Sequence, residues 1–440
     1  RPPPRTTPRQ GRRQRQMCIR DRARVQGTGE RDIVGHLSRD LDKRHRLVRA
    51  QGIQRMDGQR LSQYRFRHIL FQRYLYGSLD EVERAYLHEA VGNTLEALYE
   101  GHAEPRASTA GQLAGQLAWH FQEAGIAARA IPYLHQAGDR AVRLCAYQEG
   151  VAHLTRALEL LLTLPPSPER DQQELALQLS LGMAWIGAPP PEREKAYRRA
   201  RELSLQTGQT SGLFQIAGQL AVFHYVRAEN QRARELAEEA LDVALQGGDP
   251  LVVAVGHWYV GLVMYGLGDF AAAHAHFGQM ISFYDPQEHH GPCLGIHGSD
   301  AGVGALAYDA CCLWALGYPE KGLERREEAL ALARELDHPF TLADVLCYGG
   351  CVFDRMRRDA RALKDNAEEL IRVAKDMALP SWLGHGIYFR GEAMVRLGKV
   401  QAGRVHMREG IAAVEAVRVR ILRTGVLCAL AEAEANSGLP

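Results

Sequence analysis

Residues 226–241, VRAENQRARELAEEAL, and residues 266–281, GLGDFAAAHAHFGQMI, follow the same pattern. In each stretch, the end of one apolar helix meets a tight turn, and a second amphipathic helix begins directly after it. The pattern recurs in residues 315–330, 355–370 and 396–411. Aligning the turn residues Glu229, Asp269, Tyr318, Asp359 and Lys399 gives spacings of 40, 49, 41 and 40 residues.

A fixed period of this length, with two amphipathic helices in each unit, predicts an array of stacked helix pairs. Each unit consists of helix A, a turn, helix B and a breaker such as GGDP or DHP. Weaker copies occupy residues 117–141 and 146–161. We therefore expect residues 101–440 to form an all-α, right-handed superhelix of the tetratricopeptide type, with a functional concave surface.

The longest interval contains an insert, DPQEHHGPCLGIHGSD, at residues 285–300. Its Gly, Pro and His content predicts a solvated loop across the repeat surface. Imidazole and thiolate groups are zinc ligands, so His289, His290, Cys293 and His297 are the best metal candidates in the sequence. They lack a second ligand pair at a defined spacing, and we expect no metal site.

Several cysteines and tryptophans fall at repeating positions. Cys347 and Cys351 are four residues apart on one helix face, and Cys311–Cys312 lies one repeat earlier. Buried thiols commonly fill helix contacts, so we favour core packing over redox sensing. We likewise favour inter-repeat packing over a ligand platform for three tryptophans in or near A helices, Trp258, Trp314 and Trp382. The charged runs at 198–202 and 324–328 are expected to be solvated faces of B helices.

The region before the repeats has a different period. Helical apolar spacing around residues 33–41 gives way to Asp57-Gly58, a two-residue hairpin signal, and then to the alternating Tyr64, Phe66 and His68. A helix followed by a hairpin is typical of the end of a winged-helix domain. We assign residues 30–76 to such a remnant (α+β) and residues 77–100 to a connecting helix.

Residues 1–22 are unlike the rest of the chain, with eight Arg and one Asp. An Arg- and Pro-rich arm would ordinarily be disordered. However, residues 17–22, MCIRDR, are what the reading frame ATG TGT ATA AGA GAC AGR encodes, and that frame resembles the end of a transposase-type sequencing adapter. We interpret residues 1–22 as an adapter artefact and expect both ends of the chain to be fragment ends. The net charge is +2, and the part after residue 75 is acidic, which does not favour nucleic-acid binding.

Residues 64–99, YRFRHILFQRYLYGSLDEVERAYLHEAVGNTLEALY, resemble the junction after the winged helix in bacterial regulatory ATPases of the STAND class. The resemblance is carried by Phe66, Arg67, His68, Tyr74, Leu75, Arg84, Leu87 and His88. It extends over residues 30–440 and is most specific in the segment from SFYDPQEH (282–289) to WALGYPEKG (314–322). Phe66 and Tyr74 are expected to dock the helix that carries Leu87 and Val91 onto the hairpin.

The resemblance implies a sensor and protein-interaction arm that regulates an upstream nucleotide-binding domain and an effector. Its partners would be a protein or small ligand on the concave surface and the intramolecular ATPase domain, with no direct nucleic acid and no membrane. Such proteins often carry a class III adenylate or guanylate cyclase domain or a DNA-binding effector.

No Walker A motif occurs in this sequence, and Gly398-Lys399 is followed by Val400. We therefore expect a non-catalytic, cytoplasmic chain without catalytic, cofactor-binding or metal residues, with ATP and Mg²⁺ bound only in the missing upstream domain. Two alternatives stay open. The chain is a fragment of a protein whose ATPase or cyclase activity lies elsewhere, or it is a free-standing tetratricopeptide scaffold.

Overall fold

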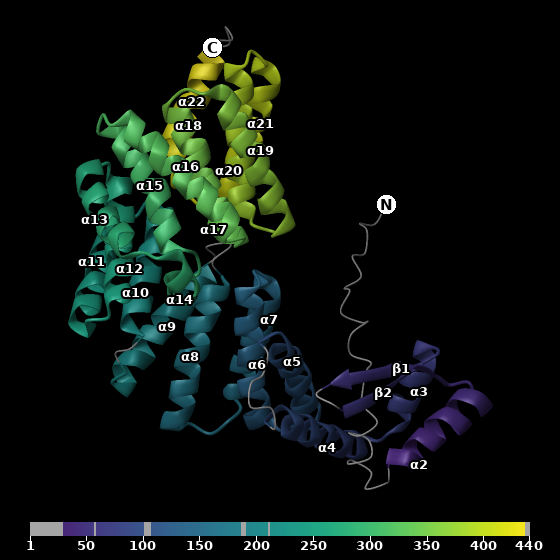
Figure 1. Cartoon of the computed structure of the whole chain (residues 1–440). Helices are drawn as coiled ribbons and strands as arrows, with labels where there is room; N and C mark the ends of the chain where they lie inside the picture. The colour runs from purple at the N-terminus through teal and green to yellow at the C-terminus, as the bar shows by residue number, and fades with distance from the viewer. Residues whose placement is uncertain (1–29, 57–58, 101–106, 186–190, 210–211, 436–440) are drawn as a thin grey trace. The chain divides into compact units, whose positions relative to one another are not determined.

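The computed structural model describes residues 30–56, 59–100, 107–185, 191–209 and 212–435 (Figure 1). Two compact units make up the chain. The first contains the described residues up to Ala137 together with residues 156–165, and the second contains residues 138–155 and those from 166 onward. Residues 1–22, including the adapter-like stretch, lie outside the described residues, and so does Asp57-Gly58.

The first unit begins with one helical segment and a two-stranded antiparallel sheet. The elements are the α-helix α2 (Glu30–Gly35), the π-helix η2 (His36–Arg44), and the strands β1 (Val48–Met56) and β2 (Gln59–Phe66). Val48 pairs with Phe66 at one end of the sheet and Met56 pairs with Gln59 at the other, on either side of residues 57–58. Ile33 and Leu37 are buried against Val48, because the helical apolar stripe covers one face of the hairpin. The predicted helix and hairpin are therefore present.

The rest of the first unit is helical and is held by a polar cluster. Its helices are α3 (Ile69–Ser78), α4 (Glu81–Glu100), α5 (Ala107–Glu123) and the larger part of α6 (Ala127–Arg143). The Tyr76 hydroxyl lies 3.0 Å from Nε2 of His88 and donates to Oε2 of Glu123 at 3.2 Å. Nδ1 of His88 lies 2.9 Å from Nδ1 of His120. These bonds join α3, α4 and α5, and burial lowers the pKa of His120 to about 4.

The expectation that Phe66 and Tyr74 dock α4 onto the hairpin is wrong. Phe66 packs against the cluster of α2 and η2. Tyr74 is 76% exposed. The reason is spacing: Tyr76, two residues further along α3, faces α4, so Tyr74 on the same helix faces away from it.

The second unit consists of antiparallel helix pairs, which Figure 1 shows side by side from teal to yellow. Its first helices are α7 (Tyr147–Leu161), of which the part up to residue 155 belongs here, α8 (Pro168–Ala184) and α9 (Pro191–Thr207). The A helices that follow are α10 (Leu213–Val226), α12 (Pro250–Leu267), α15 (Ala301–Ala315), the broken helix α17 (Pro339–Val345)–η3 (Leu346–Val352)–α18 (Phe353–Met356), and α20 (Pro380–Arg396). Their B helices are α11 (Asn230–Gly247), α13 (Phe270–Phe283), α16 (Pro319–Glu335), α19 (Ala360–Asp376) and α21 (Val400–Ala416), and α22 (Arg423–Ala435) ends the described part.

The five turn residues found by aligning the sequence are all N-cap residues of B helices. At two of them a carboxylate accepts from a backbone amide of the first turn. Asp269 accepts from the Ala272 amide and Asp359 from the Ala362 amide, each at 3.0 Å. A short side chain with an acceptor satisfies an amide that has no partner within the helix. The predicted period therefore corresponds to a real structural repeat.

Residues 285–300 contain a helix, contrary to the predicted loop. Helix α14 (Pro286–His297) begins at the N-cap Asp285, whose carboxylate accepts from the Gln287 amide at 2.8 Å. It ends at Gly298, which has φ = 89°. Gly-Pro inside the insert argues for a loop, but Cys293 and His297 are buried on one face and hold the helix in place. Tertiary packing thus outweighs a poor helix propensity.

Helix α12 is the core of the array. Among the described residues it alone is long and apolar enough to cross a membrane, by length and composition only. Its apolar window is 56% buried, and it packs against α10, α11, α13 and α15. An apolar helix enclosed in this way is typical of a protein core.

The pair α20–α21 packs most closely. A Cβ atom on Gly403 would lie 2.6 Å from the carbonyl oxygen of Gly391, and a Cβ on Gly391 would lie equally close to the carbonyl of Gly403. Only glycine fits at either position, so the two backbones are in contact.

Candidate functional site

The four residues singled out as possible metal ligands do not converge. Nδ1 of His290 lies 2.7 Å from Asp300, and Nδ1 of His289 accepts from the Asp285 amide at 2.9 Å. His297 lies against Trp258, with ring centroids 4.2 Å apart. Within the described residues, no group of three or more His, Cys, Asp or Glu side chains could hold a metal ion.

The cysteines and tryptophans singled out from the sequence lie where packing was expected. Cys311, Cys312, Cys347 and Cys351 are fully buried. Burial raises the pKa of Cys311 to about 12, which leaves it a thiol at neutral pH. Trp258 contacts Tyr259 and His297, Trp314 contacts Phe353, and Trp382 contacts Phe340 and Tyr348.

A cysteine–histidine pair that no sequence pattern indicated lies in the second unit. Sγ of Cys145 is 3.5 Å from Nε2 of His338, whose Nδ1 lies 2.8 Å from Oγ1 of Thr341. This is the order of groups in a nucleophile, its base and an orienting partner. Burial nevertheless raises the pKa of Cys145 and lowers that of His338 to about 4, so both groups stay neutral. The pair is therefore a buried contact and not an activated thiolate.

Aromatic side chains of successive A helices meet in a buried column. The rings of Tyr265 and Tyr308 lie 5.2 Å apart, and those of Tyr308 and Tyr348 lie 4.3 Å apart. Tyr348 in turn contacts Trp382, with 6.4 Å between centroids. Tyr308 and Tyr348 are both almost completely buried. These side chains fill the space between successive A helices, so the A-helix faces that carry them offer no surface to a ligand.

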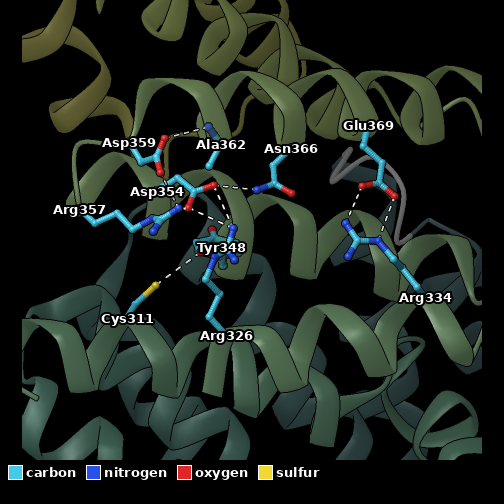
Figure 2. A network of polar contacts seen from close by, with 10 residues as sticks. All are labelled: Cys311, Arg326, Arg334, Tyr348, Asp354, Arg357, Asp359, Ala362, Asn366 and Glu369. Atoms are coloured by element: carbon cyan, nitrogen blue, oxygen red, sulfur yellow. Dashed lines mark hydrogen bonds and ion pairs between the residues drawn. The ribbon is translucent and has the colours of Figure 1, made fainter. Parts of the chain in front are cut away.

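The buried carboxylate of Asp354 lies in α18, near the C-terminal end of one A helix, and is the centre of the network in Figure 2. Its oxygens lie 3.1 Å from Nη2 of Arg326, 2.9 Å from Nε of Arg357 and 2.7 Å from Nδ2 of Asn366. Arg357 also donates to Asp359, the N-cap of α19, at 2.8 Å. Burial raises the pKa of Asp354, and the two guanidinium groups and the Asn366 amide offset part of that rise.

This arrangement corrects one expectation from the sequence. The charged run at 324–328 was predicted to be a solvated face, but the side chain of Arg326 is only 13% exposed. It reaches from α16 to α18 and thereby joins two successive repeats. A second contact in Figure 2 has the same effect, since Arg334 of α16 donates to both oxygens of Glu369 of α19 at 3.3 and 2.7 Å.

An open hollow of about 480 Å³ lies at the turn between α21 and α22. We call it the arginine hollow, and it is lined by Arg227, Glu415, Arg418, Val419, Arg420 and Arg423. Arg227 comes from the turn between α10 and α11, so the site combines residues from distant parts of the second unit. Its volume lies in the range of small-molecule sites.

A small apolar cavity of about 20 Å³ adjoins the arginine hollow and shares Glu415, Val419 and Arg423 with it. His385 of α20 lines this cavity and is 4% exposed. Neither of its ring nitrogens makes a hydrogen bond of normal geometry. Burial lowers the pKa of His385 to about 4, and a backbone contact with Ser381 offsets part of the shift. A cavity of this size is large enough for one water molecule at most.

The sequence contained no signal for this site. Arg418, Arg420 and Arg423 lie in a segment without a motif, and Arg227 lies almost half the chain away. The chemistry that four guanidinium groups offer is recognition of oxyanions, because each presents a fork of N–H donors.

Comparison with known proteins establishes the fold. No family model matches the chain. An uncharacterized protein of Rhizobium meliloti (strain 1021) is 22% identical over 351 residues, which are 79% of this chain and 33% of that protein. The chain thus spans about a third of the length of the curated relative it matches.

Several solved structures share the helical-repeat fold. A Rap protein complexed with Competence and Sporulation Factor superimposes with a TM-score of 0.53 at 12% identity, over 79% of this chain and 98% of that chain. The Rap conjugation gene regulator of plasmid pLS20, in complex with the Phr* peptide, gives 0.53 at 14% identity, over 78% of this chain and 93% of that chain.

A STAND protein with a tetratricopeptide repeat sensor from Pyrococcus horikoshii gives a TM-score of only 0.40 at 13% identity, over 94% of this chain and 62% of that chain. The identities to all three structures are too low to indicate more than the fold.

Proposed function

We propose that this chain is the sensor and protein-interaction arm of a STAND-type regulatory ATPase. The observation that carries the proposal is the array itself: α10–α21 stack as five helix pairs whose A helices are buried and whose accessible side chains remain for a partner. The sequence resemblance of residues 64–99 supplies the ATPase part of the proposal. The fold shared with two Rap proteins, whose structures contain a bound factor or peptide, supports a receptor role.

The mechanism follows from how a repeat array responds to a ligand. Each repeat contacts only its neighbours for most of its surface, so a ligand that bridges repeats favours one spacing of the stack over another. If the array also contacts a nucleotide-binding domain, binding at the array changes the stability of that contact. The chain itself performs no chemistry in this proposal, and ATP hydrolysis and the effector output belong to the parent protein.

The test begins with the gene. The source locus is sequenced on both sides of this reading frame. We expect the codons of residues 1–22 to be absent from it, and a frame that encodes a Walker A motif to continue into Ile33. The ATPase rate of that parent protein is then compared with the rate of a variant lacking residues 107–435. We expect a several-fold higher basal rate in the variant, since the array restrains the parent. A start codon with its own ribosome-binding site close to residue 30 contradicts the proposal and identifies a free-standing scaffold.

A further inference from the structure

The arginine hollow forms where the two ends of the α10–α21 array meet. The amides of Arg420 and Ile421 both donate to the carbonyl oxygen of Val226, at 2.7 and 3.1 Å. Val226 is the last residue of α10, and residues 417–422 follow α21. We call residues 417–422 the strap. Two backbone hydrogen bonds therefore fix the strap against the first A helix of the array.

The strap is held in one conformation, which sets where its arginines lie. Arg418 and Leu422 have φ angles of 59° and 65°, in the left-handed region that side chains other than glycine rarely adopt. The Val419 amide also donates to the carbonyl oxygen of Val414 at 3.3 Å. A segment fixed in this way loses little conformational freedom when a ligand binds.

The positive charge of the hollow is only partly balanced. Arg423 donates to Glu415 at 3.2 Å, and Arg227 donates to Glu229, which lies outside the hollow, at 2.8 Å. Arg418 and Arg420 are exposed and form no ion pair within 4.0 Å in the part of the chain that the structure describes. The guanidinium groups of Arg418 and Arg420 thus remain available for a ligand. Those of Arg227 and Arg423 lie beside them and are already oriented by carboxylates.

This charge pattern differs from that of several other arginines of the array. Arg326 and Arg357 are directed at the buried carboxylate of Asp354, and Arg334 is directed at the half-buried carboxylate of Glu369. Along α11, Arg232 and Arg234 are exposed but each pairs with a glutamate of its own helix at 2.8 Å. Guanidinium groups that outnumber the carboxylates around a hollow are typical of sites for phosphate or carboxylate ligands.

We propose that the arginine hollow binds a small ligand carrying two or more oxyanionic groups, phosphate or carboxylate. Such a ligand contacts Arg227 on one side and Arg418 and Arg420 on the other. It therefore joins the α10–α11 turn to the strap and strengthens the contact that closes the array. The inference deepens the proposed function, because it identifies the hollow as the effector site of the sensor arm.

Isothermal titration calorimetry on the complete chain tests the site directly. Two probes separate the possible sources of charge: inorganic pyrophosphate for phosphate and citrate for carboxylate. We expect one of them to bind at low salt with Kd below roughly 1 mM, and the affinity to fall as NaCl is raised, because the contact is ionic. The melting temperature should rise with that probe and not with the other.

The double variant Arg418→Ala/Arg420→Ala is expected to weaken binding at least about tenfold, since two charge-assisted contacts are lost. The matched control is Arg232→Ala/Arg234→Ala, which removes the same charge from α11 and should bind like the unmodified chain. Equal loss in both variants would mean nonspecific attraction and overturn the proposal. So would the absence of binding by either probe up to roughly 10 mM. Binding that has no effect on the ATPase rate of the parent protein contradicts the proposed function and leaves the site standing.

Discussion

The Asp354 network and the arginine hollow use the same residue type for opposite purposes. In the network, Arg326 and Arg357 converge on a carboxylate with no exposed surface. In the hollow, Arg418 and Arg420 form no ion pair among the described residues, and Glu415, the one carboxylate in the lining, is paired with Arg423. The comparison teaches that the number of arginines at a site says little about its role. What decides the role is whether the partner charge is supplied by the protein.

Removing the carboxylate of Asp354 should destabilise the network around it, and this is the largest effect that we expect. Asp354→Ala leaves Arg326 and Arg357 without their buried counter-charge, and we expect a loss of about 3–5 kcal/mol in the free energy of unfolding. Urea denaturation followed by circular dichroism measures it. The control is Asp359→Ala, which removes a helix cap and the more exposed partner of Arg357 on the same α18–α19 turn and should cost about 1 kcal/mol. Equal losses in both variants would show that the buried pair contributes no more than a cap.

Beneath the hollow, His385 allows a test that depends on pH. Its pKa in the folded chain is about 4, below the usual 6.5, so the unfolded chain binds more protons between those values. The neutral imidazole contributes stability above pH 6.5 that is lost as the pH falls toward 4. Asp344, whose pKa burial raises to about 7, opposes this trend, which makes a difference measurement necessary.

The difference in unfolding free energy between the unmodified chain and His385→Leu should therefore change by roughly 1.4 kcal/mol per pH unit over this range, in favour of the variant at low pH. Denaturation curves at several pH values give the difference. If the unfolding free energies of the two proteins change in parallel with pH, His385 already has a polar partner.

The smallest effect is expected at the hollow itself. Arg418→Ala and Arg420→Ala should each change the free energy of unfolding by less than about 0.5 kcal/mol, because these exposed side chains hold no described partner. The same urea measurement checks this in the absence of added anions. A loss above roughly 1.5 kcal/mol in either variant would indicate a structural arginine, as in the Asp354 network, and would remove the contrast between the two regions.

The repeat architecture could be predicted because it depends on local signals. Asp269 and Asp359 cap helices through their own turns, and the same turn recurs along the chain, so the period is visible without any long-range information. The helix at residues 286–297 was missed because Pro292 and the glycines disfavour it, and its support comes from burial of Cys293 and His297.

The site could not be predicted for a related reason. Arg227 and Arg420 come together only through the curvature of the whole array, and no spacing along the sequence records that curvature. The Cys145–His338 contact was missed in the same way, since 193 positions separate the two residues.

The hydrogen bonds from Arg420 and Ile421 to Val226 have a consequence for how the second unit folds. An open solenoid is nearly one-dimensional: its repeats can form in any order, and its stability grows by one interface at a time. A contact between positions 226 and 420 raises the contact order and makes the first repeat dependent on the last. Truncation from the C-terminal side should then destabilise the start of the array as well as its end. In that respect α10–α21 is expected to unfold as a closed, globular domain does, in a single transition.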